Sequence, residues 1–577
     1  MPLNRLARPN PVWTPPEPIP SDVDLTTLHP HRLISSLLWR RGIRTPEEAS
    51  AFLTSRPADT LNPGLLPNIE AAAARTSTAL RNHEHIGIFG DYDADGITST
   101  ALLFRALASV TGEDHVTAFI PSRSDGYGVS ARGVRHLAEQ GSTLMIAVDC
   151  GTNDTESVAV ARSLGMDVII LDHHEIDGTS PDDVILVSPQ LHPDGIYQEL
   201  TGAGVTYLFV LALAAEGFPV FHLDDDQPER VLDLVTLGTV TDVGALRGAN
   251  RVLVRQGLDV LRHSSRPGIQ AIIRHGDFDP AKLTADRISF GLGPRLNAAG
   301  RVGKPEAALR LLLTTDKEEA NDLAMQLEQW NHTRRLRSDD ILAQVEEKIL
   351  AIPDWQTRPF IALYGPDWDT GLVGPIASKI AERMGVPALV MHEHDGVLTG
   401  SGRSVHGIDL LDLLHEAKPL LTRYGGHAGA GGVTMPVANF AAFNDAIIAA
   451  VRQKGLALPQ PPSIAIDAWL PEQAQRLDVA RILNVLEPFG RDNVQPVFGI
   501  EKARLLRYDA MGKAREHLKL RIGTPGRELE AILWQGAHRS AELTLATHVA
   551  LVGTLGINAW NGNERLQLIL QDFRRID

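Results

Sequence analysis

The sequence is poor in cysteine and in long apolar runs. Its 577 residues include one cysteine, Cys150, which excludes a disulfide framework and is typical of a reducing cytosol. No apolar stretch is long enough to cross a bilayer, and the proline-rich start lacks the apolar core of a secretion signal. We therefore expect a soluble, cytoplasmic protein with no membrane partner.

Positive charge is also scarce. Lysine and arginine total 55 against 71 aspartates and glutamates, which gives a formal net charge of −16. This balance argues weakly against a nucleic-acid partner. However, net charge averages over all faces of a protein and counts carboxylates that hold metal ions as bare charge. The charge balance therefore leaves the partner open.

The length of the chain predicts several domains, because a single hydrophobic core stops growing well below this size. Apolar runs such as "IGIF", "TLMIAV" and "DVIIL" alternate with amphipathic stretches, which predicts a parallel sheet covered by helices. A second α/β pattern and then several short strand patterns follow. We expect an α/β protein made of a proline-rich start with helices (1–60), an α/β lobe (61–310), a long helix (311–352), a smaller α/β lobe (353–458) and an all-β domain (459–577).

Two connecting segments are predicted between these parts. Residues 315–350 have the pattern of one long helix, in which Thr315 and Glu318 form a capping box and Leu323, Leu327 and Trp330 recur at helical spacing. The stretch "GLALPQPPS" predicts a linker, because clustered prolines stiffen a segment that buries little.

Acidic and histidine side chains follow four apolar, strand-like runs, which read "IFGDYDADG", "MIAVDCG", "VIILDHHE" and "LGTVTDV". Ligands of an open parallel sheet bind outside the carboxyl ends of its strands, at the switch in strand order, so we expect the four clusters to converge. Carboxylates with imidazole, and no thiolate cluster, suit Mg²⁺ or Mn²⁺. This many carboxylates can hold two ions, which together promote in-line displacement at phosphorus. Cys150 follows Asp149 and should face the other way, so we interpret it as structural.

Simpler interpretations exist for single clusters. An aspartate after a strand is most often a turn or capping residue, and Asp91 is either such a residue or a support for metal ligands. The start "IGIFGDYDADG" also resembles the nucleophile strand of haloacid dehalogenase phosphatases, but that class leaves "DHHE" unexplained. A dinucleotide site requires G-x-G-x-x-G, and three carboxylates there would repel a pyrophosphate. Four clusters together favour a metal centre.

The motifs "DYDADG", "VDCGT", "LDHHE" and "GTVTDV", in this order, resemble the four motifs of the DHH phosphoesterase superfamily. The stretches "SRSDGYGVS", "FGLGPRLNAAGR", "GSGRSVHGIDL" and "EPFGRDNVQPVF" are similar to the RecJ family of single-strand-specific 5′→3′ exonucleases. "RYGGHAGAGGVTM" resembles the glycine-rich mark of the DHHA1 domain. The resemblance implies a DHH catalytic lobe, a DHHA1 lobe and a C-terminal OB-fold.

The resemblance also implies roles for particular residues. Two Mn²⁺ or Mg²⁺ ions would be held by Asp93, Asp95, Asp149, His173 and Asp242. The expected catalytic group is Asp149, Asp172 and His174: His174 contacts the substrate phosphate or supports the metal ligands, and Asp172 orients the histidines. The candidates for binding DNA are Arg123, Arg295, Arg301, Ser401, Arg403 and His427. For each arginine the alternative is a surface or ion-paired residue.

The C-terminal region resembles an OB-fold that holds single strands. Residues 501–521 carry more lysine and arginine than acid, and Tyr508, Trp534 and Trp560 are candidates for stacking on bases, although each could instead fill the barrel. Two positions depart from the family pattern. Asp369 stands where a histidine is expected, so we assign it no role, and "FGRDNVQP" lacks the second glycine of G-x-G-N-P.

The sequence therefore favours a metal-dependent exonuclease that degrades single-stranded DNA 5′→3′ to 5′-mononucleotides. The family implies contact with single-strand-binding protein, a helicase that supplies substrate, and work in recombination and repair; we expect a monomer. One alternative is a DHH-type phosphodiesterase acting on short oligonucleotides or cyclic dinucleotides, a group that usually lacks the OB domain. The other is a non-catalytic scaffold of the Cdc45 kind, which would have lost metal ligands that are all present here.

Overall fold

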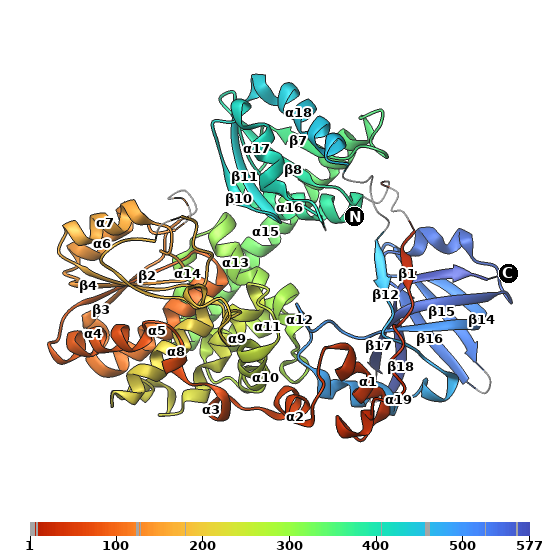
Figure 1. Ribbon diagram of the computed structural model, residues 1–577, viewed down its shortest axis with the longest axis horizontal. Coiled ribbons are helices and arrows are strands. Elements are labelled where there is room, and N and C mark those ends of the chain that lie inside the picture. Colours follow the sequence, from red (N-terminus) through yellow and green to blue (C-terminus); the bar gives the residue numbers. More distant parts are fainter. Residues whose placement is uncertain are drawn as a thin grey trace. The chain divides into compact units, whose positions relative to one another are not determined.

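The computed structural model (Figure 1) describes Leu6 and residues 10–122, 126, 128–178, 180–405, 407–455, 462–524, 527–560 and 563–576. The chain forms two compact units, one of residues 1–14 with 331–464 and the other of residues 15–330 with 465–577. Most of the predicted linker "GLALPQPPS" lies outside the described residues. Within the described part, no helix is long and apolar enough to cross a membrane.

The larger unit contains a five-stranded parallel sheet with the strand order β3-β2-β4-β5-β6. Its strands are β2 (Ile86–Gly90), β3 (Val116–Phe119), β4 (Leu144–Val148), β5 (Asp167–Leu171) and β6 (Ile185–Val187). The chain runs from β2 to β3 on one side and then returns to place β4 on the other side of β2. The switch in strand order therefore lies between β2 and β4, where open α/β sheets bind ligands.

Helices cover both faces of this sheet, as Figure 1 shows. Ile88 and Ile146 pack with the helices of one face, and Phe89 and Ala147 pack with those of the other. Because both faces are covered, every residue of β2 and β4 is buried, as the continuous apolar runs predict. The covering helices are α4 (Ile69–Arg81), α5 (Ala94–Thr111) and α8 (Gly202–Ala215) on the first face, and α6 (Ala131–Glu139) and α7 (Thr155–Ser163) on the second.

The chain between this sheet and the long helix is helical. It forms α9 (Leu232–Thr241), α10 (Gly248–Arg262), α11 (Pro267–His275), α12 (Ala285–Arg287), a π-helical turn (Ile288–Leu292), α13 (Gly293–Val302) and α14 (Pro305–Leu313). The prediction that "LGTVTDV" ends a strand is wrong, because Asp242 is the C-cap of α9. Residues 232–240 of α9 are all buried. A helix without a polar face has an apolar run that periodicity does not distinguish from a buried strand.

The predicted long helix is α15 (Lys317–Leu350), and the boundary between the two units falls inside it. Its first turn is capped by Asp316, whose carboxylate accepts hydrogen bonds from the backbone N–H groups of Glu318 and Glu319 at 2.7 and 3.1 Å. The predicted capping box of Thr315 with Glu318 is therefore wrong. The short carboxylate of Asp316 supplies the cap instead.

The smaller unit contains a mixed sheet with the order β10-β11-β9-β8-β7, in which only β7 and β8 run parallel. The strands are β7 (Ile361–Gly365), β8 (Ala388–His394), β9 (Val397–Arg403), β10 (Arg423–His427) and β11 (Ala430–Pro436). The second half of α15 and α16 (Thr370–Met384) pack on one face, and α17 (Leu410–Glu416) and α18 (Phe440–Gln453) on the other. This is the predicted second α/β lobe.

The C-terminal strands form a closed barrel within the larger unit. They are β13 (Ala468–Trp469), β14 (Val497–Met511), β15 (His517–Thr524), β16 (Arg527–Leu533), β17 (His548–Trp560) and β18 (Asn563–Arg575), and β14 pairs with β17 to close the sheet. Leu37 and Leu38 of α1 (Arg32–Arg40) share the barrel core with Phe498 and Phe573. The sequence carries no signal for this packing of an N-terminal helix on the C-terminal barrel. Further elements are α2 (Pro46–Thr54), α3 (Pro57–Thr60), α19 (Leu477–Ile482) and the paired short strands β1 (Val12–Thr14) and β12 (Ser463–Ala465).

Candidate metal centre

The aspartates that follow β2 are held by two helix N-termini. Asp93 is the N-cap of α5, and its Oδ1 accepts hydrogen bonds from the backbone N–H groups of Asp95 and Gly96 at 2.9 and 3.1 Å. The buried carboxylate of Asp95 accepts hydrogen bonds from the N–H groups of Gly202 and Ala203, where α8 begins, at 2.7 and 3.1 Å. Helix N-termini favour negative charge, so each fixes one carboxylate at the switch point.

Asp149 follows β4 in an unusual backbone conformation. Its φ angle is 60°, in the left-handed region that residues with a side chain rarely adopt and that tends to occur at functional sites. The first turn of α8 lies against its side chain. A Cβ atom at Gly202 would stand 2.6 Å from Oδ1 of Asp149, so only glycine permits this approach. The backbone strain and the glycine together place the Asp149 carboxylate at the switch point of the sheet.

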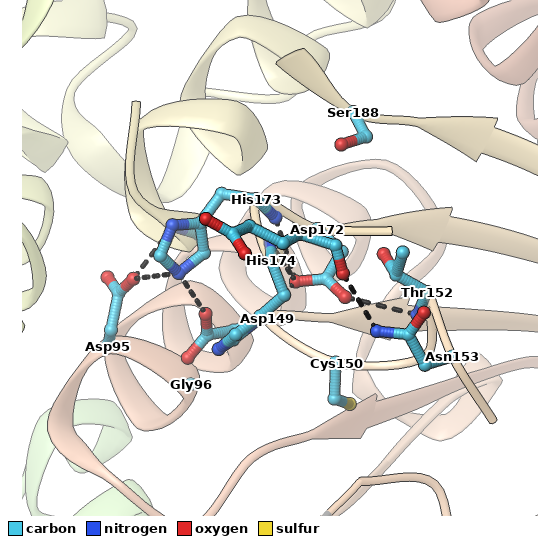
Figure 2. Close-up of polar contacts among 12 residues, drawn as sticks. Asp95, Gly96, Asp149, Cys150, Thr152, Asn153, Asp172, His173, His174 and Ser188 are labelled. Carbon is cyan, nitrogen blue, oxygen red and sulfur yellow. Dashed lines mark hydrogen bonds and ion pairs between the residues drawn. The ribbon is translucent and has the colours of Figure 1, made fainter. Parts of the chain in front are cut away.

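The two histidines that follow β5 are oriented by Asp172. Its Oδ1 lies 2.7 Å from Nδ1 of His174 and accepts a hydrogen bond from the backbone N–H of His173 at 2.8 Å. Its Oδ2 accepts a hydrogen bond from the N–H of Thr152 at 3.1 Å. Figure 2 shows Asp172 between the histidine pair and Thr152. The buried carboxylate thus fixes the ring of His174 and the backbone at His173.

The ring of His173 gathers three carboxylates. Its Nε2 lies 3.1 Å from Asp149 Oδ1, 3.8 Å from Asp242 Oδ2 and 4.0 Å from Asp95 Oδ2. Figure 2 shows Asp95 and Asp149 directed at this ring. Three overlapping sets of ligand atoms each fall within 4.8 Å, namely Asp149–His173–His174, Asp95–His173–Asp242 and Asp91–Asp93–Asp149. The structure therefore brings all five predicted metal ligands together with His174 and Asp91.

Burial and mutual repulsion raise the pKa values of the carboxylates. Burial, followed by the charges of neighbouring aspartates, raises the pKa of Asp95 and of Asp149 well above the usual range. Burial and the charge of Asp93 raise the pKa of Asp242 to about 7. Burial and the nearby His174 lower the pKa of His173 to about 4, which keeps its ring neutral and able to bind a metal. A cation among these carboxylates would favour their charged forms and lower these pKa values.

His174 differs from its neighbour in charge. Burial disfavours its charged form, but the hydrogen bond and charge of Asp172, followed by the charges of Asp242 and Asp93, raise its pKa to about 9. The same contact lowers the pKa of Asp172 although that group is buried. His174 is therefore a cation at neutral pH, and its side chain is 38% exposed. It can donate a charge-assisted hydrogen bond to an anionic oxygen.

The donor set fits Mg²⁺ or Mn²⁺. Carboxylate oxygens predominate with one neutral imidazole, and hard divalent cations prefer such ligands. The thiol of Cys150 donates instead to the carbonyls of Phe89 and Val148, at 3.9 and 3.5 Å. Two ions, when bound, supply the positive charge that activates a water molecule and stabilises displacement at phosphorus. The side chains that would hold them are Asp93, Asp95, Asp149, His173 and Asp242.

The predicted DNA-binding arginines of the larger unit have different surroundings. Arg123 lies outside the described residues. Arg295 is 5% exposed, and it donates hydrogen bonds to Glu328 at 2.5 Å and to the carbonyl of Gly291 at 2.8 Å. Arg301 is half-buried in the last turn of α13. Arg295 is thus engaged inside the protein, and DNA binding by either residue stays a prediction.

The smaller unit places Ser401, Arg403 and His427 on one part of its mixed sheet, and we call these three residues the Arg403 cluster. Arg403 stands opposite Ala430, which in turn stands opposite His427, so the two side chains lie in one row across β9, β11 and β10. A Cβ atom at Gly374 would lie 3.2 Å from Nη2 of Arg403 and 3.6 Å from Oγ of Ser401. Burial lowers the pKa of Arg403, and its Nη1 donates to a carbonyl rather than to a carboxylate.

Asp369, where the family pattern has histidine, is the N-cap of α16. Its Oδ1 accepts a hydrogen bond from the N–H of Gly371 at 2.9 Å, and its Oδ2 pairs with Arg337 at 3.0 Å. Both contacts fix the start of the helix that approaches the Arg403 cluster.

Two supports of the metal centre were not anticipated from the sequence. Oδ1 of Asn297 accepts a hydrogen bond from the N–H of Ala94 at 2.8 Å and so holds the chain between Asp93 and Asp95. At Gly238 of α9, a Cβ atom would stand 2.4 Å from Oδ1 of Asp95. Asn297 belongs to the conspicuous stretch "RLNAAGR", but nothing in the sequence indicates that this stretch reaches α5.

A cluster of aspartates and histidines at the switch point of a parallel sheet, with a second α/β unit and a β-barrel, defines a metal-dependent phosphoesterase of the DHH class. Comparison with protein families agrees: residues 85–239 match the DHH family N-terminal domain, 357–453 the DHHA1 domain and 466–572 the RecJ OB domain.

Known proteins narrow the class. The chain is 34% identical to the single-stranded-DNA-specific exonuclease RecJ of Thermus thermophilus, over 93% of this chain and 74% of that protein. It is 32% identical to the Escherichia coli exonuclease of the same name, over 94% of this chain and 95% of that one. The crystal structure of Thermus thermophilus RecJ in complex with Mn²⁺ matches with a TM-score of 0.83 and 31% identity, over 98% of this chain and 80% of that chain. The chain belongs to the RecJ family.

Proposed function

We propose that this protein degrades single-stranded DNA from the 5′ end and releases 5′-mononucleotides. The metal centre carries this proposal, because aspartate and histidine side chains suited to divalent ions gather at the switch point of the sheet. The names of the relatives, which are single-stranded-DNA-specific exonucleases, and the match to the RecJ OB domain support the choice of substrate. A scaffold without activity would not need these crowded carboxylates, because apolar residues at the same positions would stabilise the fold better.

The side chains around the metal centre have distinct tasks in this proposal. His174, held as a cation by Asp172, donates a hydrogen bond to an oxygen of the phosphate under attack. His173 stays neutral and would serve as a metal ligand, and Asp149, which belongs to two of the three sets of ligand atoms, would help to hold the ions. The Arg403 cluster binds the terminal phosphate at the 5′ end, because a guanidinium that has no carboxylate partner among the described residues matches phosphate oxygens bidentately.

The barrel offers an exposed aromatic surface for bases. Trp534 is 52% exposed and its ring lies edge-on to His517, at 4.7 Å between centroids. Tyr508 is half-buried against the barrel core, and the side chain of Trp560 lies outside the described residues. Trp469, which the sequence did not single out, is 37% exposed. Stacking on such rings holds single strands without reading their sequence.

The wider assignments follow from the proposed activity. A helicase would supply the substrate and single-strand-binding protein would contact the enzyme during recombination and repair, and the protein would work as a monomer. The catalytic, DHHA1 and OB domains would correspond to residues 61–310, 353–458 and 459–577, with the helix of residues 311–352 between the first two. A phosphodiesterase for short oligonucleotides or cyclic dinucleotides is less well supported, because such a substrate gives the barrel no task.

A labelled-end assay tests the proposal. One DNA oligonucleotide carries its label at the 5′ end in one reaction and at the 3′ end in another, both with Mn²⁺. The expected result is immediate release of the 5′ label as a mononucleotide and gradual shortening of the 3′-labelled strand. Asp149→Ala should abolish both, and Asp259→Ala, which removes an exposed carboxylate elsewhere, should change neither. If the protein cleaves only dinucleotides, the proposal that single-stranded DNA is its substrate is wrong.

A further inference from the structure

The stretch "EPFGRDN" has no task in the proposed function. Its residues 487–493, here called the 487–493 loop, precede β14 of the barrel and belong to the same compact unit as the metal centre. The family pattern G-x-G-N-P would place glycine where this chain has Asp492. Asp492 adopts a φ angle of 60°, the left-handed conformation that glycine takes easily and aspartate tolerates, so the turn is formed without glycine.

The 487–493 loop lies against the segment that follows Asp242. The N–H of Leu246 donates a hydrogen bond to the carbonyl of Arg491 at 2.8 Å. A Cβ atom at Gly490 would stand 2.7 Å from Cδ1 of Leu246, so the two chains are in close contact. Arg247 and Asp492 form an ion pair at 3.8 Å. Arg491 therefore contacts a segment that lies a few residues beyond the metal ligand Asp242, although Arg491 and Asp242 are far apart in the sequence.

The loop is also held from its other side. Arg251, which is 2% exposed, donates hydrogen bonds to the carbonyls of Glu487 and Pro488 at 2.9 and 3.3 Å. The buried amide of Asn493 donates to the carbonyls of Leu486 and Pro488 at 2.9 and 2.7 Å. These contacts fix the backbone at Arg491, and the side chain of Arg491 takes no part in them.

The side chain of Arg491 is exposed, and among the described residues no carboxylate forms an ion pair with it. Its neighbour Arg247, by contrast, pairs with both Glu199 and Asp492. The backbone of Arg491 is hydrogen-bonded to Leu246, four residues beyond the metal ligand Asp242. A permanent cation is thus anchored on a loop that packs against the segment carrying this ligand.

We propose that Arg491 is a substrate-binding residue that holds one backbone phosphate of the DNA at the edge of the metal centre. This inference rests on the proposed function. A polyanion that enters a site lined with aspartates is repelled until positive groups outweigh them. A guanidinium on a fixed loop binds such a phosphate bidentately. The barrel domain thereby contributes directly to the catalytic site.

Kinetics on single-stranded DNA test this role. The variants are Arg491→Ala and Arg491→Lys, with Arg81→Ala as the control, because Arg81 is an exposed arginine of α4 on the same unit. We expect Arg491→Ala to raise KM about tenfold, Arg491→Lys to fall between it and wild type, and the control to match wild type. The salt dependence of binding should weaken by about 0.7 in log–log slope, the value for one lost single-strand phosphate contact.

A second readout separates phosphate binding from support of the metal ligands. The increase in melting temperature on adding Mn²⁺ should be the same in wild type and Arg491→Ala. Substrates with one uncharged methylphosphonate linkage at successive positions should reveal one linkage that slows wild type but does not slow Arg491→Ala further.

Three results would overturn the inference: kinetics of Arg491→Ala equal to those of the control, a diminished Mn²⁺ effect, or equal methylphosphonate penalties in both proteins at every linkage. Wild-type protein that cleaves no DNA would instead refute the proposed function itself.

Discussion

The metal centre and the Arg403 cluster are opposite solutions to binding a charged group. In the metal centre, several aspartates are crowded at the carboxyl ends of parallel strands, and burial together with their mutual repulsion raises their pKa values. In the Arg403 cluster, a partly buried guanidinium and two polar side chains lie on a mixed sheet, and the pKa of Arg403 is lowered by burial. The metal centre therefore has an excess of negative charge, and the Arg403 cluster has an excess of positive charge.

This difference indicates which ligand each site takes. Excess carboxylate is relieved by divalent cations, whereas a guanidinium bonded to a carbonyl is satisfied by a phosphate. Neither arrangement favours the stability of the free protein, since burying unpaired charge costs free energy. Substitutions in the two sites should consequently affect different observables, and the following predictions run from the largest expected effect to the smallest.

Asp149→Ala should have the largest effect. It removes the ligand that the Asp149–His173–His174 and Asp91–Asp93–Asp149 sets share, so we expect activity to fall by about three orders of magnitude. The Mn²⁺-induced rise in melting temperature should disappear as well, because that rise requires binding to the folded state. Activity is measured on labelled single strands and stability by thermal unfolding. A variant that keeps either property would show that Asp149 is not a ligand.

Arg403→Ala should have a large effect of another kind. Loss of the guanidinium should raise KM for single-stranded DNA about tenfold, since a charge-assisted hydrogen bond to phosphate is lost. The Mn²⁺-induced rise in melting temperature should be unaffected. Arg403→Lys should recover only part of the affinity, because lysine cannot bond bidentately. If the alanine variant loses the Mn²⁺ effect and keeps its KM, the contrast between the two sites is wrong.

Trp534→Ala should weaken DNA binding moderately. The exposed ring offers one stacking surface, and its removal should raise Kd for a single strand about fivefold, measured by fluorescence anisotropy in EDTA so that no cleavage occurs. A matched substitution of the buried Phe498 would perturb the barrel core instead and should lower the melting temperature. Unchanged affinity in Trp534→Ala would exclude this ring from the DNA path.

The smallest effect concerns stability and pH. The pKa of Asp242 is raised to about 7 in the folded protein, so the folded state holds a proton that the unfolded state releases near the ordinary aspartate pKa. Its contribution to stability is therefore full in acid and is lost as pH rises from about 4 to 7. The melting temperature of the metal-free protein should fall by a few degrees over this range relative to Asp242→Asn. Parallel curves for the two proteins would contradict the raised pKa.

Much of the metal centre could be predicted because its ligands follow strands that the sequence marks clearly. Asp93, Asp149 and His173 lie within three residues of the ends of β2, β4 and β5, and the carboxyl ends of adjacent parallel strands necessarily lie together. The all-apolar character of these strands also predicts that helices cover both faces of the sheet. The local sequence was therefore sufficient to predict a metal ligand wherever that ligand follows a strand of the sheet.

The remaining features depend on contacts between distant segments. Asp242 was predicted after a strand, but it ends α9, whose burial on all sides hides its helical periodicity. Asn297 and Gly202 support the aspartates from other helices, and α1 packs on a barrel built from the far end of the chain. No local pattern encodes such packing, and only the folded chain shows it.

The central claim is that the aspartates are crowded because two divalent cations bind among them. Calorimetric titration of the metal-free protein with Mn²⁺ tests it most directly, with Asp149→Ala titrated beside it. The account predicts two ions per wild-type chain and fewer than two in the variant. Wild-type protein that binds no ion, or a variant that binds as many as wild type, would contradict it.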